Sequence, residues 1–179
     1  MKTNTLRPIQ KPHNGEFPPY AIMYIQLLPD DGSVLEHLQR NCASVKELVQ
    51  SIPEEKLLYR YAEGKWTIKE VLVHIIDDER IYAYRALRFA RNDHTELPGF
   101  EQDDYARYSG ANDRSLASIM EEYAAVRAST IAMFNGFHDD VFTRTGVANG
   151  TIVSVRALAY HLAGHELHHA AILKERYLK

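Results

Sequence analysis

Hydrophobic residues recur at helical spacing in four separate stretches of the chain, and polar residues fill the positions between them. These stretches cover residues 33–51, 67–91, 115–135 and 154–177. Apolar positions repeating every three or four residues predict amphipathic helices, here roughly 18 to 25 residues long. Helices of that length bury their apolar faces by packing side by side. The pattern therefore predicts an all-α protein, a four-helix bundle.

The second of these helices has the clearest beginning. Thr67 and Glu70 form the pattern of a capping box, in which each side chain accepts a hydrogen bond from the other residue's backbone amide. Trp66 and Val71 stand at the two positions of a hydrophobic staple, before and after the cap. The helix should begin directly after Thr67.

The connections between the helices differ in character. Residues 92–112 contain Pro98 and Gly99 and show no clear periodicity, and a loop of that length is usually functional or a crossover between non-adjacent ends of a bundle. A weak signal for a small hairpin lies in 142–153. Residues 1–19 are polar and proline-rich and are expected to form an irregular arm, which leaves residues 20–179 as the helical domain.

Composition narrows the class of protein. The formal net charge is −3 and no basic run occurs, which argues against a nucleic-acid surface. Cys42 is the single cysteine, so a reducing compartment is the simplest setting. The start of the chain lacks the apolar core of a signal peptide, and the apolar run at 20–28 is too short to span a bilayer. We expect a soluble, cytoplasmic protein that binds neither nucleic acid nor membrane.

The candidate chemistry lies in the stretch HLAGHELHH near the C-terminus. His161, His165 and His169 are spaced four residues apart and share one helix face, where two imidazoles on adjacent turns can chelate a divalent ion. His74, on the apolar side of the second helix, is the best third ligand. A metal ion held by three histidines, with further coordination positions open, is typical of a catalytic site. Buried histidines are, however, often only hydrogen-bonded core residues.

Two questions stay open at this point. His161 could be a fourth ligand, a residue lining a pocket, or part of the core. Residues 165–169 also match H-E-x-x-H, the zinc-protease pattern, whose third ligand comes from downstream. Only ten residues follow His169, and Glu175 occupies the place of that ligand. The protease match is therefore interpreted as incidental.

Three segments together carry a resemblance to a known family: GKWTIKEVLVHIIDDERIYAYRALRFARND, LPGFEQDDYA and VRALAYHLAGHELHHAAILKERYL. The chain resembles the DinB-like superfamily, in particular its YfiT-like metal-dependent hydrolases, over roughly residues 20 to 178. The resemblance implies a bundle in up-down-down-up order, with the long crossover between the second and third helices. It also implies a divalent ion, zinc or nickel, held by His74, His165 and His169, and a homodimer. His161 is an extra histidine with respect to the family pattern.

The expected activity is hydrolysis of a small molecule by water activated at a three-histidine site. Asp77, Glu79 and Glu166 are candidate catalytic carboxylates, whereas Asp78 is expected on a solvated acidic face. Arg85 could bind an anionic substrate, although a structural ion pair is the simpler role. One alternative, implied by the resemblance, is a transferase that uses bacillithiol, mycothiol, glutathione or a similar low-molecular-weight thiol. The other is a non-catalytic metal-binding or interaction module.

Overall fold

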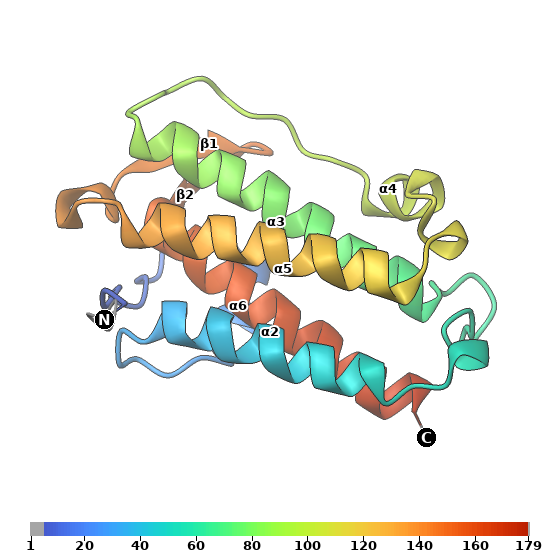
Figure 1. The fold of residues 1–179 in the computed structure, drawn as a ribbon. Helices are drawn as coiled ribbons and strands as arrows, with labels where there is room; N and C mark the ends of the chain where they lie inside the picture. Colours follow the sequence, from blue (N-terminus) through green and yellow to red (C-terminus); the bar gives the residue numbers. More distant parts are fainter. Residues whose placement is uncertain (1–5, 179) are drawn as a thin grey trace.

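Four long helices lie side by side in the computed structural model, which describes residues 6–178 (Figure 1). They are α2 (Val34–Gln50), α3 (Ile68–Ala90), α5 (Leu116–Asn135) and α6 (Val155–Ile172). The α-helical bounds of the first three agree with the sequence prediction to within a residue. The fourth ends earlier than expected as an α-helix, and residues 173–177 continue it as one π-helical turn.

The course of the chain places α3 between α5 and α6. In Figure 1, α3 and α5 run in the same direction, because the connection after α3 carries the chain back along the bundle before α5 begins. This crossover includes the short helix α4 (Gln102–Tyr108). Helix α3 packs on both α5 and α6, and α2 closes the opposite side by packing on the same two helices.

A network of hydrogen bonds fixes the N-terminus of α3. The predicted capping box is confirmed: the Glu70 amide donates to Thr67 Oγ1 over 3.1 Å, and the Thr67 amide donates to Glu70 Oε2 over 2.7 Å. Asn112, at the end of the crossover, accepts from the Thr67 hydroxyl at 2.7 Å and donates to Glu70 Oε1 at 2.9 Å. The crossover is thus tied to the helix that carries His74, about two turns after the cap.

The weakly predicted hairpin is present next to the other end of α3. Strands β1 (Thr145–Ala148) and β2 (Thr151–Ser154) are antiparallel and lead directly into α6. Their turn places Asn149 and Gly150 at φ 51° and 69°, the left-handed values that an Asn-Gly hairpin turn adopts. The crossover pairs with this hairpin, since the Leu97 amide donates to Val147 O at 3.0 Å and the Asn149 amide donates to Leu97 O at 2.9 Å.

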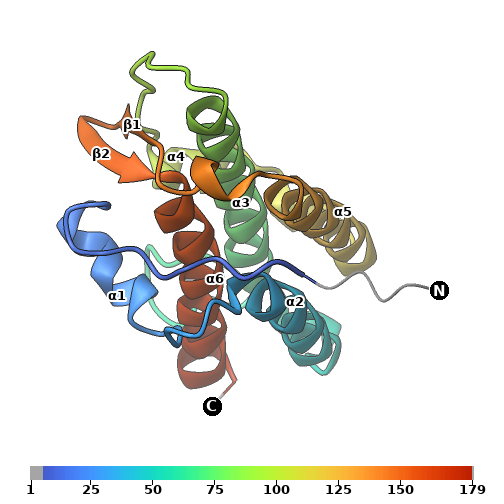
Figure 2. The same cartoon turned by 90° about the vertical axis from the view of Figure 1, so that its left-hand side faces the viewer.

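The segment before α2 covers one side of α6 (Figure 2). Residues 6–18 are irregular, but Ile9 is 1% exposed and its carbonyl accepts a hydrogen bond from the Tyr160 hydroxyl at 2.9 Å. The short helix α1 (Ile22–Ile25) follows and packs on α6. Gly164 makes this contact possible, because a Cβ there would lie 2.2 Å from the backbone oxygen of Tyr24. Across residues 6–178, no helix is both long and apolar enough to cross a membrane.

Candidate metal centre

Three imidazoles meet between α3 and α6. The Nε2 atom of His165 lies 3.1 Å from that of His74 and 3.0 Å from that of His169. The three possible donor atoms all lie within 4.8 Å of one another. The four-residue spacing on α6 aligns His165 with His169, and the packing of α3 on α6 brings His74 to them. The structure therefore assembles the same three residues that the sequence selected.

The donor set fits a single divalent cation. A tetrahedral ion with metal–nitrogen bonds of about 2.0–2.1 Å would hold its nitrogens about 3.3 Å apart, close to the separations found here. A neutral imidazole carries one proton, on either Nδ1 or Nε2. His165 Nε2 can therefore form hydrogen bonds with both His74 Nε2 and His169 Nε2 only when the proton positions of the three rings are compatible. Imidazole ligands suit zinc, nickel, copper and iron.

Burial keeps these rings in the form that binds metals. His74 is 3% exposed and His165 5%, and His169 is half-buried. Desolvation by burial lowers the pKa of His74 and, with the neighbouring histidines, lowers those of His165 and His169 to about 3 and about 2. At neutral pH the three imidazoles are uncharged, so a cation need not displace protons from them.

Asp78 supports the centre from behind His165. Its Oδ2 atom lies 3.4 Å from His165 Nδ1 and 3.4 Å from His161 Nε2, and the residue is only 4% exposed. The expectation of a solvated acidic face was therefore wrong for Asp78. Burial alone would raise the pKa of this carboxyl, but His165 and His161 hold it below its usual range. The carboxylate favours the proton of His165 on Nδ1, which leaves the Nε2 lone pair directed toward His74 and His169.

His161 lies outside the group of three. Its ring stacks on Tyr82 with centroids 3.9 Å apart and planes inclined by 3°, and its Nε2 faces Asp78. Its ring centroid lies 5.5 Å from that of His165. Of the three roles open to it from the sequence, these contacts match that of a residue lining a pocket beside the centre.

Two of the expected catalytic carboxylates are engaged by Arg127 of α5. The Arg127 Nε donates to Glu79 at 3.0 Å, and one of its terminal nitrogens donates to Glu166 at 2.9 Å. All three side chains are at most 3% exposed, and burial together with Glu79 raises the pKa of Glu166. The structure thus brings Glu79 and Glu166 to Arg127 and not into the histidine group. Sequence reasoning missed Arg127, although a basic residue among the apolar positions of α5 was a usable signal.

Asp77 also lies away from the histidine nitrogens. It is half-buried and lines a shallow depression with Asp104, Tyr105 and neighbouring residues of α4. Burial raises the pKa of this carboxyl. In the described part of the chain, His74, His165 and His169 are the group of potential ligands that converges, and Asp77 does not join it. Its catalytic role stays a prediction.

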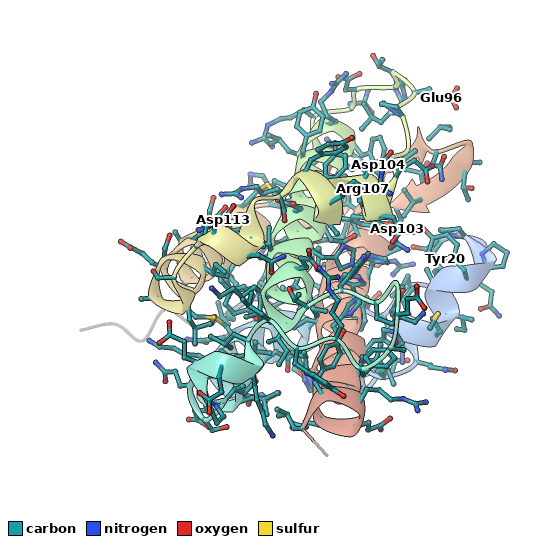
Figure 3. The ribbon with its side chains drawn as sticks, turned by 90° about the vertical axis from the view of Figure 1, so that its right-hand side faces the viewer. Tyr20, Glu96, Asp103, Asp104, Arg107 and Asp113 are labelled. Atoms are coloured by element: carbon teal, nitrogen blue, oxygen red, sulfur yellow. The ribbon has the colours of Figure 1, made fainter. Side chains whose placement is uncertain are left out.

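A cavity of about 310 Å³ opens beside His165. Asp78, His161 and His165 line it together with residues of the N-terminal segment, the crossover and the hairpin. A second depression, of about 390 Å³, adjoins His169 and includes Asp103 and Gln102 of α4. Figure 3 views this end of the bundle, with Asp103 on α4 and Tyr20 on the N-terminal segment flanking α6. The two hollows thus border two of the three converging histidines, His165 and His169.

Comparison with known proteins agrees with this geometry. Residues 37–173 match the DinB superfamily. The chain belongs to this superfamily. A protein of Oceanobacillus iheyensis described as a "putative metal-dependent hydrolase" is 29% identical over 143 residues, which cover 78% of this chain and 81% of that protein.

A solved structure shares the fold. YfiT from Bacillus subtilis, described as a "probable metal-dependent hydrolase with an unusual four-helix bundle topology", superposes with a TM-score of 0.72. The match covers 82% of this chain and 85% of YfiT, at 16% sequence identity. At that identity the likeness concerns the fold, and the predicted four-helix bundle is confirmed, whereas the up-down-down-up order stays a prediction.

Proposed function

We propose that this DinB superfamily member is a metal-dependent hydrolase of a small molecule. The observation that carries the proposal is the convergence of three uncharged imidazoles, two buried and one half-buried, beside a cavity. Three protein ligands leave a coordination position for water, as catalytic zinc sites do. When bound, a divalent cation supplies a Lewis acid that lowers the pKa of water toward neutrality. The descriptions of the two similar proteins support the same class of reaction.

The residues around the histidines have distinct tasks in this proposal. Asp78 orients His165 through Nδ1, and His161, held against Tyr82, forms the wall of the cavity next to it. Glu79 and Glu166 bind Arg127, and so they join α3, α5 and α6 and fix the separation of the ligand-bearing helices. The contacts of these two carboxylates favour a positioning role over the proton transfer expected from the sequence.

Metal analysis of protein purified without a histidine tag tests the proposal. We expect about one zinc or nickel ion per chain, and loss of that ion in His169→Ala. His168→Ala is the matched control, because His168 is the adjacent histidine and lies outside the converging group. Wild-type protein that binds neither ion after incubation with zinc or nickel would contradict the metal site.

Turnover separates the hydrolase from its alternatives. The zinc-loaded protein should hydrolyse at least one member of a panel of small esters and amides, and His169→Ala should not. Activity only in the presence of a low-molecular-weight thiol would favour the transferase, and a bound ion without any turnover would favour a binding module. The expected homodimer stays a prediction that light scattering can test.

A further inference from the structure

Arg85 is a buried cation for which the described residues provide no carboxylate partner. The side chain is 6% exposed and lines the cavity beside His165. Within residues 6–178, no aspartate or glutamate oxygen lies within ion-pair distance of its guanidinium, whereas Arg127 has two such partners. A buried charge without a counterion is unfavourable, and proteins usually pair it. The structural ion pair considered from the sequence is therefore absent from the described residues.

The guanidinium is nevertheless held in a defined orientation. One terminal nitrogen donates to Pro98 O of the crossover at 2.8 Å, and the guanidinium carbon lies 4.9 Å from the centre of the Tyr82 ring. Pro98 is in turn next to Leu97, whose backbone is paired with the hairpin. Among the described residues, this is the single hydrogen bond of a group with five N–H donors. The remaining donors are available to a ligand in the cavity.

The position of Arg85 relates it to the metal centre. Asp78, Tyr82 and Arg85 follow one face of α3, at positions i, i+4 and i+7, and all three line the same cavity. Seven residues of helix span about 10 Å, so the cavity extends roughly that far between the level of Asp78 and that of Arg85. His165 is at the first end, since it contacts Asp78. One cavity thus has a candidate metal ligand near one end and an uncompensated cation near the other.

We propose that Arg85 binds the carboxylate of a small substrate whose reacting bond lies several atoms away, at the histidine centre. A carboxylate matches one guanidinium in charge and can accept two parallel N–H bonds from it. Among the described lining residues, Arg85 is the single lysine or arginine, and a doubly charged phosphate would call for more cationic groups. A cavity of about 310 Å³ lies at the small end of ligand sites. The hydrolysis of this substrate rests on the proposed hydrolase function, whereas the binding of a carboxylate to Arg85 does not.

Binding to the metal-free protein tests the carboxylate site by itself. Glutarate and its uncharged diamide, glutaramide, have the same carbon skeleton, and calorimetry should show glutarate binding more tightly to the wild type. Arg85→Met should weaken glutarate binding at least tenfold, and so should Arg85→Gln, which keeps a donor for Pro98. Arg91→Met is the matched control, because Arg91 also lies over an aromatic ring, Phe137, but lines none of the cavities described here. Equal affinity for glutarate and glutaramide, or an unchanged glutarate affinity in both Arg85 variants, would overturn the proposal.

A second experiment connects the site with turnover. The zinc-loaded protein should hydrolyse mono-4-nitrophenyl glutarate with at least tenfold higher kcat/KM than 4-nitrophenyl pentanoate, and Arg85→Gln should bring the ratio of the two kcat/KM values close to one. Equal rates with both esters, unaffected by the substitution, would contradict the carboxylate site and leave the hydrolase standing. Failure to hydrolyse either ester would count against the hydrolase, while the glutarate measurement still decides on Arg85.

Discussion

The carboxylate of Asp78 and the imidazole of His165 face each other across the interface of α3 and α6, with Oδ2 and Nδ1 3.4 Å apart. On the opposite side of the same imidazole, Nε2 meets the two other histidines. A carboxylate behind a metal-binding histidine fixes its tautomer and increases its basicity. Asp78 is not one of the three converging residues, but through His165 it should influence the affinity of the whole centre for a metal ion.

Replacing Asp78 with asparagine should weaken zinc binding about 10- to 100-fold, the range typical of such supporting residues. The amide keeps the size of the side chain but loses its charge and can present a donor to His165. Competition with a chromogenic chelator measures the change. Asp104→Asn, a substitution on the adjacent helix α4, should leave the affinity unaltered. An Asp78→Asn protein with wild-type affinity would remove the support role.

Arg127→Met should destabilise the protein by about 3–5 kcal/mol, because it leaves Glu79 and Glu166 buried without their cation. Urea unfolding gives the free energy. In the control, Arg80→Met removes a partly exposed pair with Glu122 and should change stability by about 0–1 kcal/mol. Adding Glu79→Leu and Glu166→Leu to Arg127→Met should recover much of the loss. Equal losses for Arg127→Met and Arg80→Met would show that the buried network is not important for stability.

The metal-free protein should lose stability as the pH falls from about 6.5 to 5. The histidines of the unfolded chain take up protons near their ordinary pKa of 6.5, whereas burial keeps His165 and His169 unprotonated down to about 3 and about 2. Each such group contributes a slope of up to about 1.4 kcal/mol per pH unit. The stability is fully present above the unfolded pKa and is lost below it.

Urea unfolding at several pH values in the presence of a chelator measures this slope. His169→Gln should reduce it by about one proton, and the exposed His13→Gln should not reduce it as much. A slope that is the same in wild type and His169→Gln would show that His169 is protonated in the folded protein.

Gly164→Ala should destabilise the protein by about 1–3 kcal/mol, because its Cβ would lie 2.2 Å from a backbone oxygen, which cannot rotate away as a side chain can. Helix α1 must then move from α6, and with it Tyr24, whose ring contacts His165 edge-on with centroids 5.3 Å apart. Gly136→Ala, with its nearest contact at 3.3 Å, is the milder comparison. Thermal unfolding compares the two, and equal melting temperatures would contradict the close contact.

The sequence was most informative where the determinants are local. The helices follow from apolar spacing, and the beginning of α3 follows from the reciprocal Thr67–Glu70 cap. The three histidines could be selected because a four-residue spacing aligns two of them and the bundle brings a third to them. Asp78 could have been included on the same basis, since it stands four residues after His74 and shares its face of α3.

The parts that were not predicted depend on contacts between distant segments. Arg127, Glu79 and Glu166 come from three different helices, and no spacing rule joins them. Glu79 and Glu166 were accordingly expected at the catalytic centre and are instead bound to Arg127. The lack of a carboxylate partner for Arg85 among the described residues also depends on tertiary structure. The sequence places acidic residues on the same helix but does not tell which of them can reach the Arg85 guanidinium.

The pairing of the crossover with the β-hairpin has a consequence for how such a protein can diversify. The helices that carry the three histidines and the far wall of the cavity are built from different stretches of chain. The backbone of Leu97 and its hairpin partners joins the segments of the far wall. Insertions or exchanges at Pro98–Phe100 or at the Asn149 turn would reshape the space around a bound molecule without moving the imidazoles. Selection for a new ligand can therefore act on two short surface segments while the helices that carry the three histidines stay constant.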